Sequence, residues 1–240
     1  MQILLLSNQL EGFAICQLAR RLEADGHDIL IAECHWYNFL NSDAVFDYYE
    51  EQGWEDYVTY RDYYERLYED KPIDWEFLEE FEETNCVNKN VHQLMLTDPI
   101  LQRHTHTRAP FFLPIESDQM VYRWTELQLK WTLETIEDVD PDAIFTIGRN
   151  QFVKNAAAQI AMSSDVQMYT LIHSRIGGLS YIARDFGLGQ EPRAAAYMRR
   201  DDLMEADLRE AEDFVDAFRT GGESASLYSL PTQVDEDSGH

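Results

Sequence analysis

Polar and charged side chains that could do chemistry follow several apolar segments of this 240-residue chain. They are Asn8, Glu11, Arg149, Asn150, His173, Ser174 and Arg175, with Gly12 directly after Glu11. A carboxylate such as Glu11 can accept a proton from a bound ligand, and the alternative is an ordinary solvated loop carboxylate. The guanidinium of Arg175 presents a planar fork of donors that suits an anion, and the alternative is a salt bridge within an acidic chain. Asp98 is interpreted as a helix N-cap or turn residue rather than a catalytic one.

Four short apolar runs, residues 2–6, 29–32, 143–147 and 167–172, are expected to position these side chains as neighbouring parallel strands. Between the first two runs, apolar residues recur at helical spacing over residues 13–22, and Gly26 can take the left-handed conformation that ends a helix. Strand, helix and parallel strand form a βαβ unit. Because ligands of such sheets bind beyond the carboxyl ends of the strands, the polar residues are predicted to share one groove.

The middle of the chain is rich in Tyr, Trp, Asp and Glu. The spacing of its aromatic residues predicts a helix over residues 48–68, whose aromatic face packs in a core or interface or stacks on sugar rings. A second, acidic helix follows Pro72, with Trp75, Leu78 and Phe81 expected to face inward. Further helices are predicted over residues 116–139 and 152–162. His104 and His106 stand two apart without a third ligand, so no metal site is predicted.

The charge balance is strongly acidic, with a net charge of −26, a pI near 4.4 and only four lysines. Acidic residues dispersed along the chain, with few lysines, favour a protein adapted to a high-salt cytosol, where self-repulsion is screened. The absence of a basic stripe argues against nucleic acid as a partner. Three widely separated cysteines, with no CxxC pair, indicate free thiols in a reducing cytoplasm. No apolar run is long enough to span a bilayer, and the first run lacks the basic flank of a signal peptide.

Three blocks together resemble a known family. The first is the opening 32 residues, with Ala19-Arg20-Arg21-Leu22 followed by Asp25-Gly26-His27-Asp28. The second is residues 81–101, with Asn90-x-x-x-Leu94 and Thr97-Asp98, although Pro99 stands where a basic residue is expected. The third consists of Pro141-Asp142 and Ser174-Arg175-Ile176-Gly177. In this order they resemble the N-terminal, acceptor-side domain of GT-B glycosyltransferases of the surface or capsule polysaccharide biosynthesis type.

The resemblance implies an α/β fold, a three-layer Rossmann-like parallel sheet over residues 1–200 with a helical, aromatic-rich insertion at 35–115. A C-terminal helix at 201–219 and a disordered acidic tail at 220–240 are expected to follow. Nothing after Gly189 has the strand pattern of a donor-binding domain. We therefore expect one of three situations: a partner chain supplies the donor half, the chain is a truncated relative of the family, or the domain binds its ligand without catalysing transfer.

As a glycosyltransferase half, the chain would use Glu11 as the base for an acceptor hydroxyl. The resemblance implies that Asn8, Gly12, Arg149, Asn150, His173, Ser174 and Arg175 bind the substrate. The partners implied are a glycan or lipid-linked sugar acceptor and a donor-domain protein or a second copy of the chain, in a cytoplasmic setting or at the membrane periphery. No tightly bound cofactor is expected, and a nucleotide-sugar donor would arrive through the partner.

Two other readings stay open. The first is a non-catalytic binding or assembly subunit of a larger complex, favoured by the aromatic residues of the middle segment because aromatic side chains are enriched in interface cores. The second is a flavodoxin-like nucleotide-binding domain, which the missing GxGxxG fingerprint weakens.

Overall fold

The computed structural model describes residues 1–8, 11–34, 43–60, 63, 66–69, 71–97, 117–148, 151–164, 166–173 and 180–184. The chain divides into two compact units, Met1–Leu171 with Ile182–Phe186, and Ile172–Tyr181 with Gly187–His240. Nearly all described residues belong to the first unit. His104, His106 and the segments 201–219 and 220–240 lie outside the described residues, so the expectations for them stay predictions.

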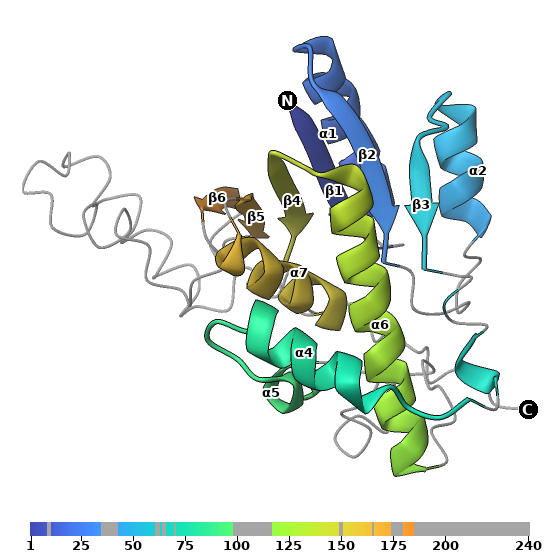
Figure 1. The fold of residues 1–240 in the computed structure, drawn as a ribbon. Helices are drawn as coiled ribbons and strands as arrows, with labels where there is room; N and C mark the ends of the chain where they lie inside the picture. The colour runs from blue at the N-terminus through green and yellow to red at the C-terminus, as the bar shows by residue number, and fades with distance from the viewer. Residues whose placement is uncertain are drawn as a thin grey trace, which may run out of the picture. The chain divides into compact units, whose positions relative to one another are not determined.

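A largely parallel sheet forms the centre of the first unit (Figure 1). The strands are β1 (Gln2–Ser7), β2 (Asp28–Glu33), β3 (Tyr57–Thr59), β4 (Ala143–Ile147), β5 (Gln167–His173) and β6 (Ser180–Arg184), in the order β3-β2-β1-β4-β5-β6. The pairs β2–β3, β1–β2, β1–β4 and β4–β5 are all parallel. The four strands predicted from the apolar runs are therefore confirmed as parallel neighbours. The Rossmann-like α/β class is confirmed with them.

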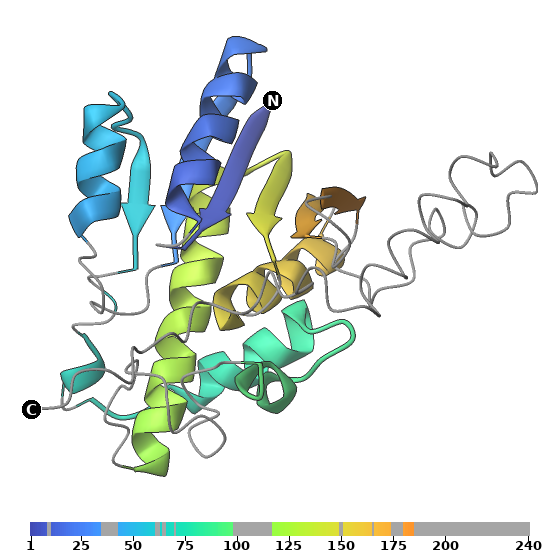
Figure 2. The same cartoon turned by 180° about the vertical axis from the view of Figure 1, so that it is seen from behind.

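Helices cover both faces of the sheet, because the central strands β1 and β2 carry apolar side chains on both sides. In Figure 1, α6 (Asp118–Val139) lies in front of the strands, and Figure 2 shows α1 (Gly12–Ala24) in front when the sheet is seen from behind. On the α1 face, α2 (Asp43–Glu51) completes one apolar cluster around Leu5, Ile31 and Ile15. On the opposite face, α6 and α7 (Phe152–Ser163) pack around Leu4, Leu6 and Ile144. The helices predicted near 13–22, 116–139 and 152–162 are confirmed.

The predicted helix over residues 48–68 is wrong. Helix α2 ends at Glu51, Gly53 turns the chain with a φ of +69°, and the next residues form strand β3 and the short 3-10 helix η1 (Arg66–Tyr68). Tyr, Val and Thr favour a strand, and pairing with β2 overrides the helical spacing. The ring of Tyr60 is buried edge-on against Trp124 and Trp131, so at Tyr60 the aromatic residues serve core packing.

The acidic helix is confirmed as α4 (Trp75–Asn85), and a short helix α5 (Val91–Met95) follows it. Leu78 and Phe81 face inward as expected, whereas Trp75 is 51% exposed, contrary to the prediction. The reason is that Trp75 is the first helical residue, after the N-cap Asp74. Its ring leans on Tyr122 of α6 at a centroid distance of 4.8 Å instead of entering the core.

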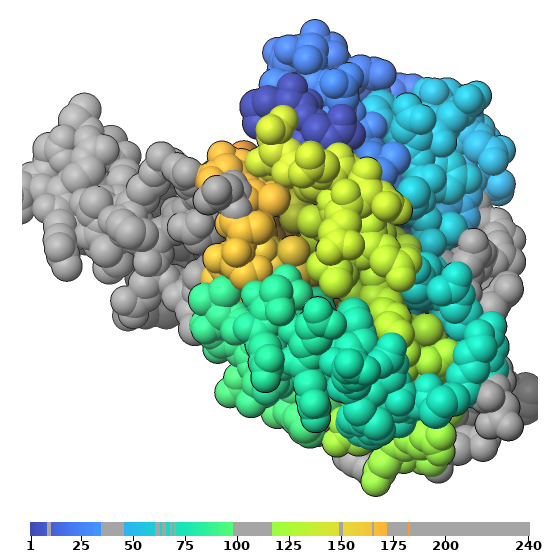
Figure 3. Space-filling view, viewed as in Figure 1, coloured from blue at the N-terminus to red at the C-terminus, as the bar shows by residue number. Residues whose placement is uncertain are grey.

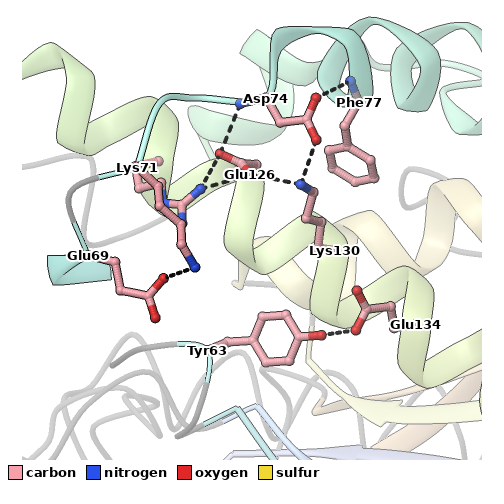
Figure 4. Close-up of polar contacts among 9 residues, drawn as sticks. Tyr63, Glu69, Lys71, Asp74, Phe77, Glu126, Lys130 and Glu134 are labelled. Atoms are coloured by element: carbon pink, nitrogen blue, oxygen red, sulfur yellow. Dashed lines mark hydrogen bonds and ion pairs between the residues drawn. The ribbon is translucent and has the colours of Figure 1, made fainter. Parts of the chain in front are cut away.

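Charged side chains fasten α4 to α6 at the point drawn in Figure 4. The Lys130 ammonium donates to Asp74 Oδ2 at 2.8 Å and to Glu126 Oε1 at 2.9 Å. Arg123 donates to both oxygens of Glu126, which is only 1% exposed. Buried carboxylates require such partners. Lys130 and Arg123, two of the few cationic side chains of this chain, therefore stabilise the contact between α4 and α6. Figure 3 shows α4 and α5 beside α6 and α7 on this surface.

Gln159 joins α7 to the turn between α4 and α5. Gln159 Oε1 accepts hydrogen bonds from the backbone N–H groups of Val87, Asn88 and Lys89 at 3.0, 3.0 and 3.3 Å. Its Nε2 donates to Asn88 Oδ1 at 2.9 Å. Separately, in the part of the chain that the structure describes, no helix has both the length and the apolar character to cross a bilayer.

Candidate functional site

A buried ion pair lies where the strand order reverses, between β1 and β4. Glu11 is the N-cap of α1 and Lys154 lies in the first turn of α7, so the two residues come from helices on opposite faces of the sheet. Lys154 Nζ is 2.5 Å from Glu11 Oε2 and donates to the Ile147 carbonyl at 2.6 Å. The Lys154 side chain is fully buried and that of Glu11 is 15% exposed. This reversal point is where sheets of this class bind ligands.

A second polar group lies at the carboxyl ends of β1 and β2, against α2. Tyr49 donates from its hydroxyl to Glu33 Oε2 at 2.9 Å, and the Tyr49 and Ser7 hydroxyls are 3.2 Å apart. Ser7, Glu33 and Tyr49 are all completely buried. Ser7 and Glu33 are the last residues of β1 and β2, and they are register partners. The sheet register therefore sets this hydroxyl–phenol–carboxyl chain in place.

Burial shifts the acidity of these groups. Desolvation raises the pKa of Glu33 to about 7, and hydrogen bonds from Tyr49 and Ser7 oppose the rise only in part. Burial also raises the pKa of Glu11, with the neighbouring Lys154 charge pulling in the opposite direction. The pKa values of the Tyr49 phenol and the Cys34 thiol are raised by burial as well, so both groups stay protonated at neutral pH.

Several buried polar atoms at this end of the sheet lack a hydrogen-bond partner within the described residues. They are Glu33 Oε1, Thr146 Oγ1, Thr170 Oγ1 and Gln151 Oε1. Thr146 is the last but one residue of β4, its register partner Thr170 lies in the middle of β5, and Gln151 is the N-cap of α7. Since buried polar atoms are nearly always paired, the partners of these atoms are water, a ligand or parts of the chain outside the described residues.

Only some of the site residues predicted from the sequence can be placed. Glu11 lies in the buried ion pair, and Gly12 is the buried first residue of α1. Asn8 precedes them, and its Oδ1 accepts a hydrogen bond from the Glu11 N–H at 3.2 Å. His173 ends β5, but its side chain is outside the described residues. Arg149, Asn150, Ser174 and Arg175 are also outside them, so their assignment stays a prediction.

Sequence reasoning missed Lys154, Glu33 and Tyr49. Lys154 carried a signal, since a lysine inside a very apolar helical stretch, in a chain with only four lysines, is unusual. Glu33 also carried one, as the acidic residue that ends an apolar run. Tyr49 carried none, because its role depends on how α2 packs.

The site differs from the dinucleotide sites of this fold class. In those sheets an acidic residue at the end of the second strand accepts a ribose hydroxyl. Glu33 holds that place, but its Oε2 already accepts from Tyr49 and its side chain is fully buried. The loop after β1 also keeps only the last glycine of the fingerprint, Gly12. The polar groups present therefore fit a dinucleotide poorly.

Among the residues with described positions, no three His, Cys, Asp or Glu side chains are close enough together to hold an ion.

The fold and the buried polar groups at the carboxyl ends of its strands define a Rossmann-like α/β protein. Its candidate ligand site lies at the point where the strand order reverses. Comparison of the chain with known protein-family models gave no match, and comparison with curated proteins gave none either.

Proposed function

We propose that the chain is a sugar-binding, acceptor-side domain of the GT-B glycosyltransferase type, acting in surface glycan synthesis or protein glycosylation together with a donor-binding partner. The observation that carries the proposal is the Glu11–Lys154 pair at the reversal of strand order. It offers a carboxylate acceptor and an ammonium donor side by side. Adjacent acceptor and donor groups of this kind suit the hydroxyl groups of a neutral sugar, each of which is both donor and acceptor.

Within this proposal Glu11 acts as the base. It accepts the proton of the acceptor hydroxyl as that oxygen bonds to the anomeric carbon of the donor sugar, while the bond from that carbon to the nucleoside diphosphate breaks and the diphosphate leaves on the donor-binding partner. The raised pKa of Glu11 makes its carboxylate a stronger base. Lys154 holds the carboxylate in position and compensates its charge. The residues predicted at the neighbouring strand ends, Arg149, Asn150 and Arg175, would contact the remaining hydroxyl groups.

The test has two readouts on the full chain in high salt. A panel of neutral oligosaccharides is first screened for binding by calorimetry. Transfer from nucleotide-sugars is then assayed with the donor-domain protein encoded nearest to this chain's gene. Glu11→Gln keeps the hydrogen-bonding shape but removes the base, so binding should stay within about threefold while transfer falls by at least about a hundredfold. Arg175→Ala should weaken binding itself.

Glu80→Gln is the matched control, since it removes the same charge from the exposed side of α4. Equal transfer by the wild-type and Glu11→Gln proteins would remove Glu11 as the base. Failure of the wild-type chain to bind any glycan would refute the proposed function as a whole, and it would favour the alternative of a non-catalytic assembly subunit.

A further inference from the structure

The N-terminus of α7 is a buried helix end that its own N-cap side chain does not satisfy. Its first intrahelical hydrogen bond runs from Asn155 N to the Gln151 carbonyl at 3.1 Å. The N–H groups of Phe152, Val153 and Lys154 therefore have no partner within the helix. All three residues are at most 3% exposed.

Three other helices of this chain satisfy their first N–H groups with a side chain, whereas α1, like α7, has no side-chain cap. Asp74, Asn90 and Ser117 each accept a hydrogen bond from the first turn of α4, α5 and α6. Gln151 makes no such bond, although its side chain starts at the helix end. Gln151 is 5% exposed, and its Oε1 has no partner in the described part of the chain. The free N–H groups of this buried helix end require an acceptor, whereas Gln151 Oε1, itself an acceptor, requires a donor, and a phosphoryl group that carries one proton can supply both.

A cationic side chain lies at this helix end and already contacts a carboxylate oxygen. The Lys154 ammonium belongs to the same first turn, and its contact with Glu11 Oε2 shows that a carboxylate oxygen fits against it. Helix N-termini favour anions through both their free N–H groups and the helix dipole. Glu11 thus occupies one of the positions that a ligand's oxyanion would take.

We propose that the N-terminus of α7, with Lys154 and Gln151, binds a phosphoryl group, and that Glu11 competes with this group for Lys154. The inference rests on the proposed function, because a phosphoryl group is what a nucleotide-sugar, its nucleotide product or a lipid-linked acceptor would bring. The site differs from the usual one of this fold class, which is the helix after the first strand. Here the N-cap of that helix is the acidic Glu11.

Because Glu11 and the phosphoryl group compete for Lys154, the proposal predicts whether a substitution of Glu11 raises or lowers phosphate affinity. Binding of inorganic diphosphate, a nucleoside diphosphate and a hexose 1-phosphate to the full chain is measured by calorimetry at one fixed chloride concentration. The three probes distinguish a free diphosphate, a nucleotide and a sugar phosphate as the source of the group. Glu11→Gln removes the competing charge, so affinity for the preferred probe should rise about fivefold, whereas Glu80→Gln should leave it unchanged.

A second variant probes the helix end itself. Gln151→Glu places a carboxylate on the free N–H groups of α7, so it should lower phosphate affinity at least about tenfold while raising the thermal unfolding midpoint through capping. Its unfolding midpoint also shows that the variant is folded. Lys154→Met should lose binding as well, but its fold must be verified because the lysine is buried.

Three results would overturn the inference: no binding of any probe by the wild-type chain, weaker binding by Glu11→Gln, or unchanged binding by a folded Gln151→Glu variant. In the first case an ordered water, not a ligand, satisfies the helix end, and in the other two the probe binds elsewhere on the chain. Glycan binding is measured separately, so loss of the phosphoryl site leaves the proposed sugar site standing. The opposite effects of Glu11→Gln on transfer and on phosphate affinity keep the two proposals distinct.

Discussion

Replacing Glu33 with glutamine tests the buried carboxyl group at the end of β2 directly. Burial raises the pKa of Glu33 from 4.5 to about 7 in the folded protein. Because this pKa exceeds the unfolded value, the folded state binds a proton more tightly. The associated stability is fully present below pH 4.5 and is lost as the pH rises through 7. At about 1.4 kcal/mol per pKa unit, the loss amounts to about 3 kcal/mol.

Glu33→Gln cannot titrate, so it should not show this loss. The variant can still accept the Tyr49 hydrogen bond, but its amide N–H groups add a constant cost of about 1–3 kcal/mol in a buried place without acceptors. That constant cancels when two pH values are compared. We therefore expect the stability of the variant relative to wild type to improve by about 3 kcal/mol between pH 4 and pH 8.5.

The assay is urea unfolding at a series of pH values and one salt concentration, followed by the fluorescence of the buried Trp124 and Trp131. Glu80→Gln controls for the loss of one formal charge, and its stability should differ from wild type by less than about 0.5 kcal/mol throughout. A difference between Glu33→Gln and wild type that stays constant within about 1 kcal/mol over this pH range would refute the reasoning.

Two further substitutions test contacts that position the site. Lys154→Met should destabilise the fold by about 3–5 kcal/mol, because it leaves the largely buried Glu11 carboxylate unpaired. A double-mutant cycle by urea unfolding should then show that adding Glu11→Gln recovers part of this loss, and strictly additive losses would mean that the two side chains do not interact. Gln159→Leu should cost about 2–4 kcal/mol because three backbone N–H groups lose their acceptor. With the half-buried Gln52→Leu as control, equal unfolding midpoints for the two variants would contradict the role given to Gln159.

The sequence alone determined the elements whose local signals agree with their packing. The runs that became β1, β2, β4 and β5 are mostly apolar, as strands buried on both faces tend to be. Helix α1 ends at Ala24, and Gly26 follows its C-cap with a φ of +88°, as its sequence predicts. The position of Glu11 was predictable for a similar reason. Residues that follow the first strand of such a sheet lie at the carboxyl ends of the strands, wherever the rest of the chain lies.

Tertiary structure decided the rest, because it depends on contacts between residues far apart in the chain. Strand β3 exists through pairing with β2, against a helical spacing of its aromatic residues. Lys154 meets Glu11 across 143 positions, and Tyr49 reaches Glu33 only because α2 packs over the end of β2. Burial, which sets the pKa of Glu33, is a property of this packing. A sequence pattern reports which face of an element is apolar, but not which distant side chain will close over it.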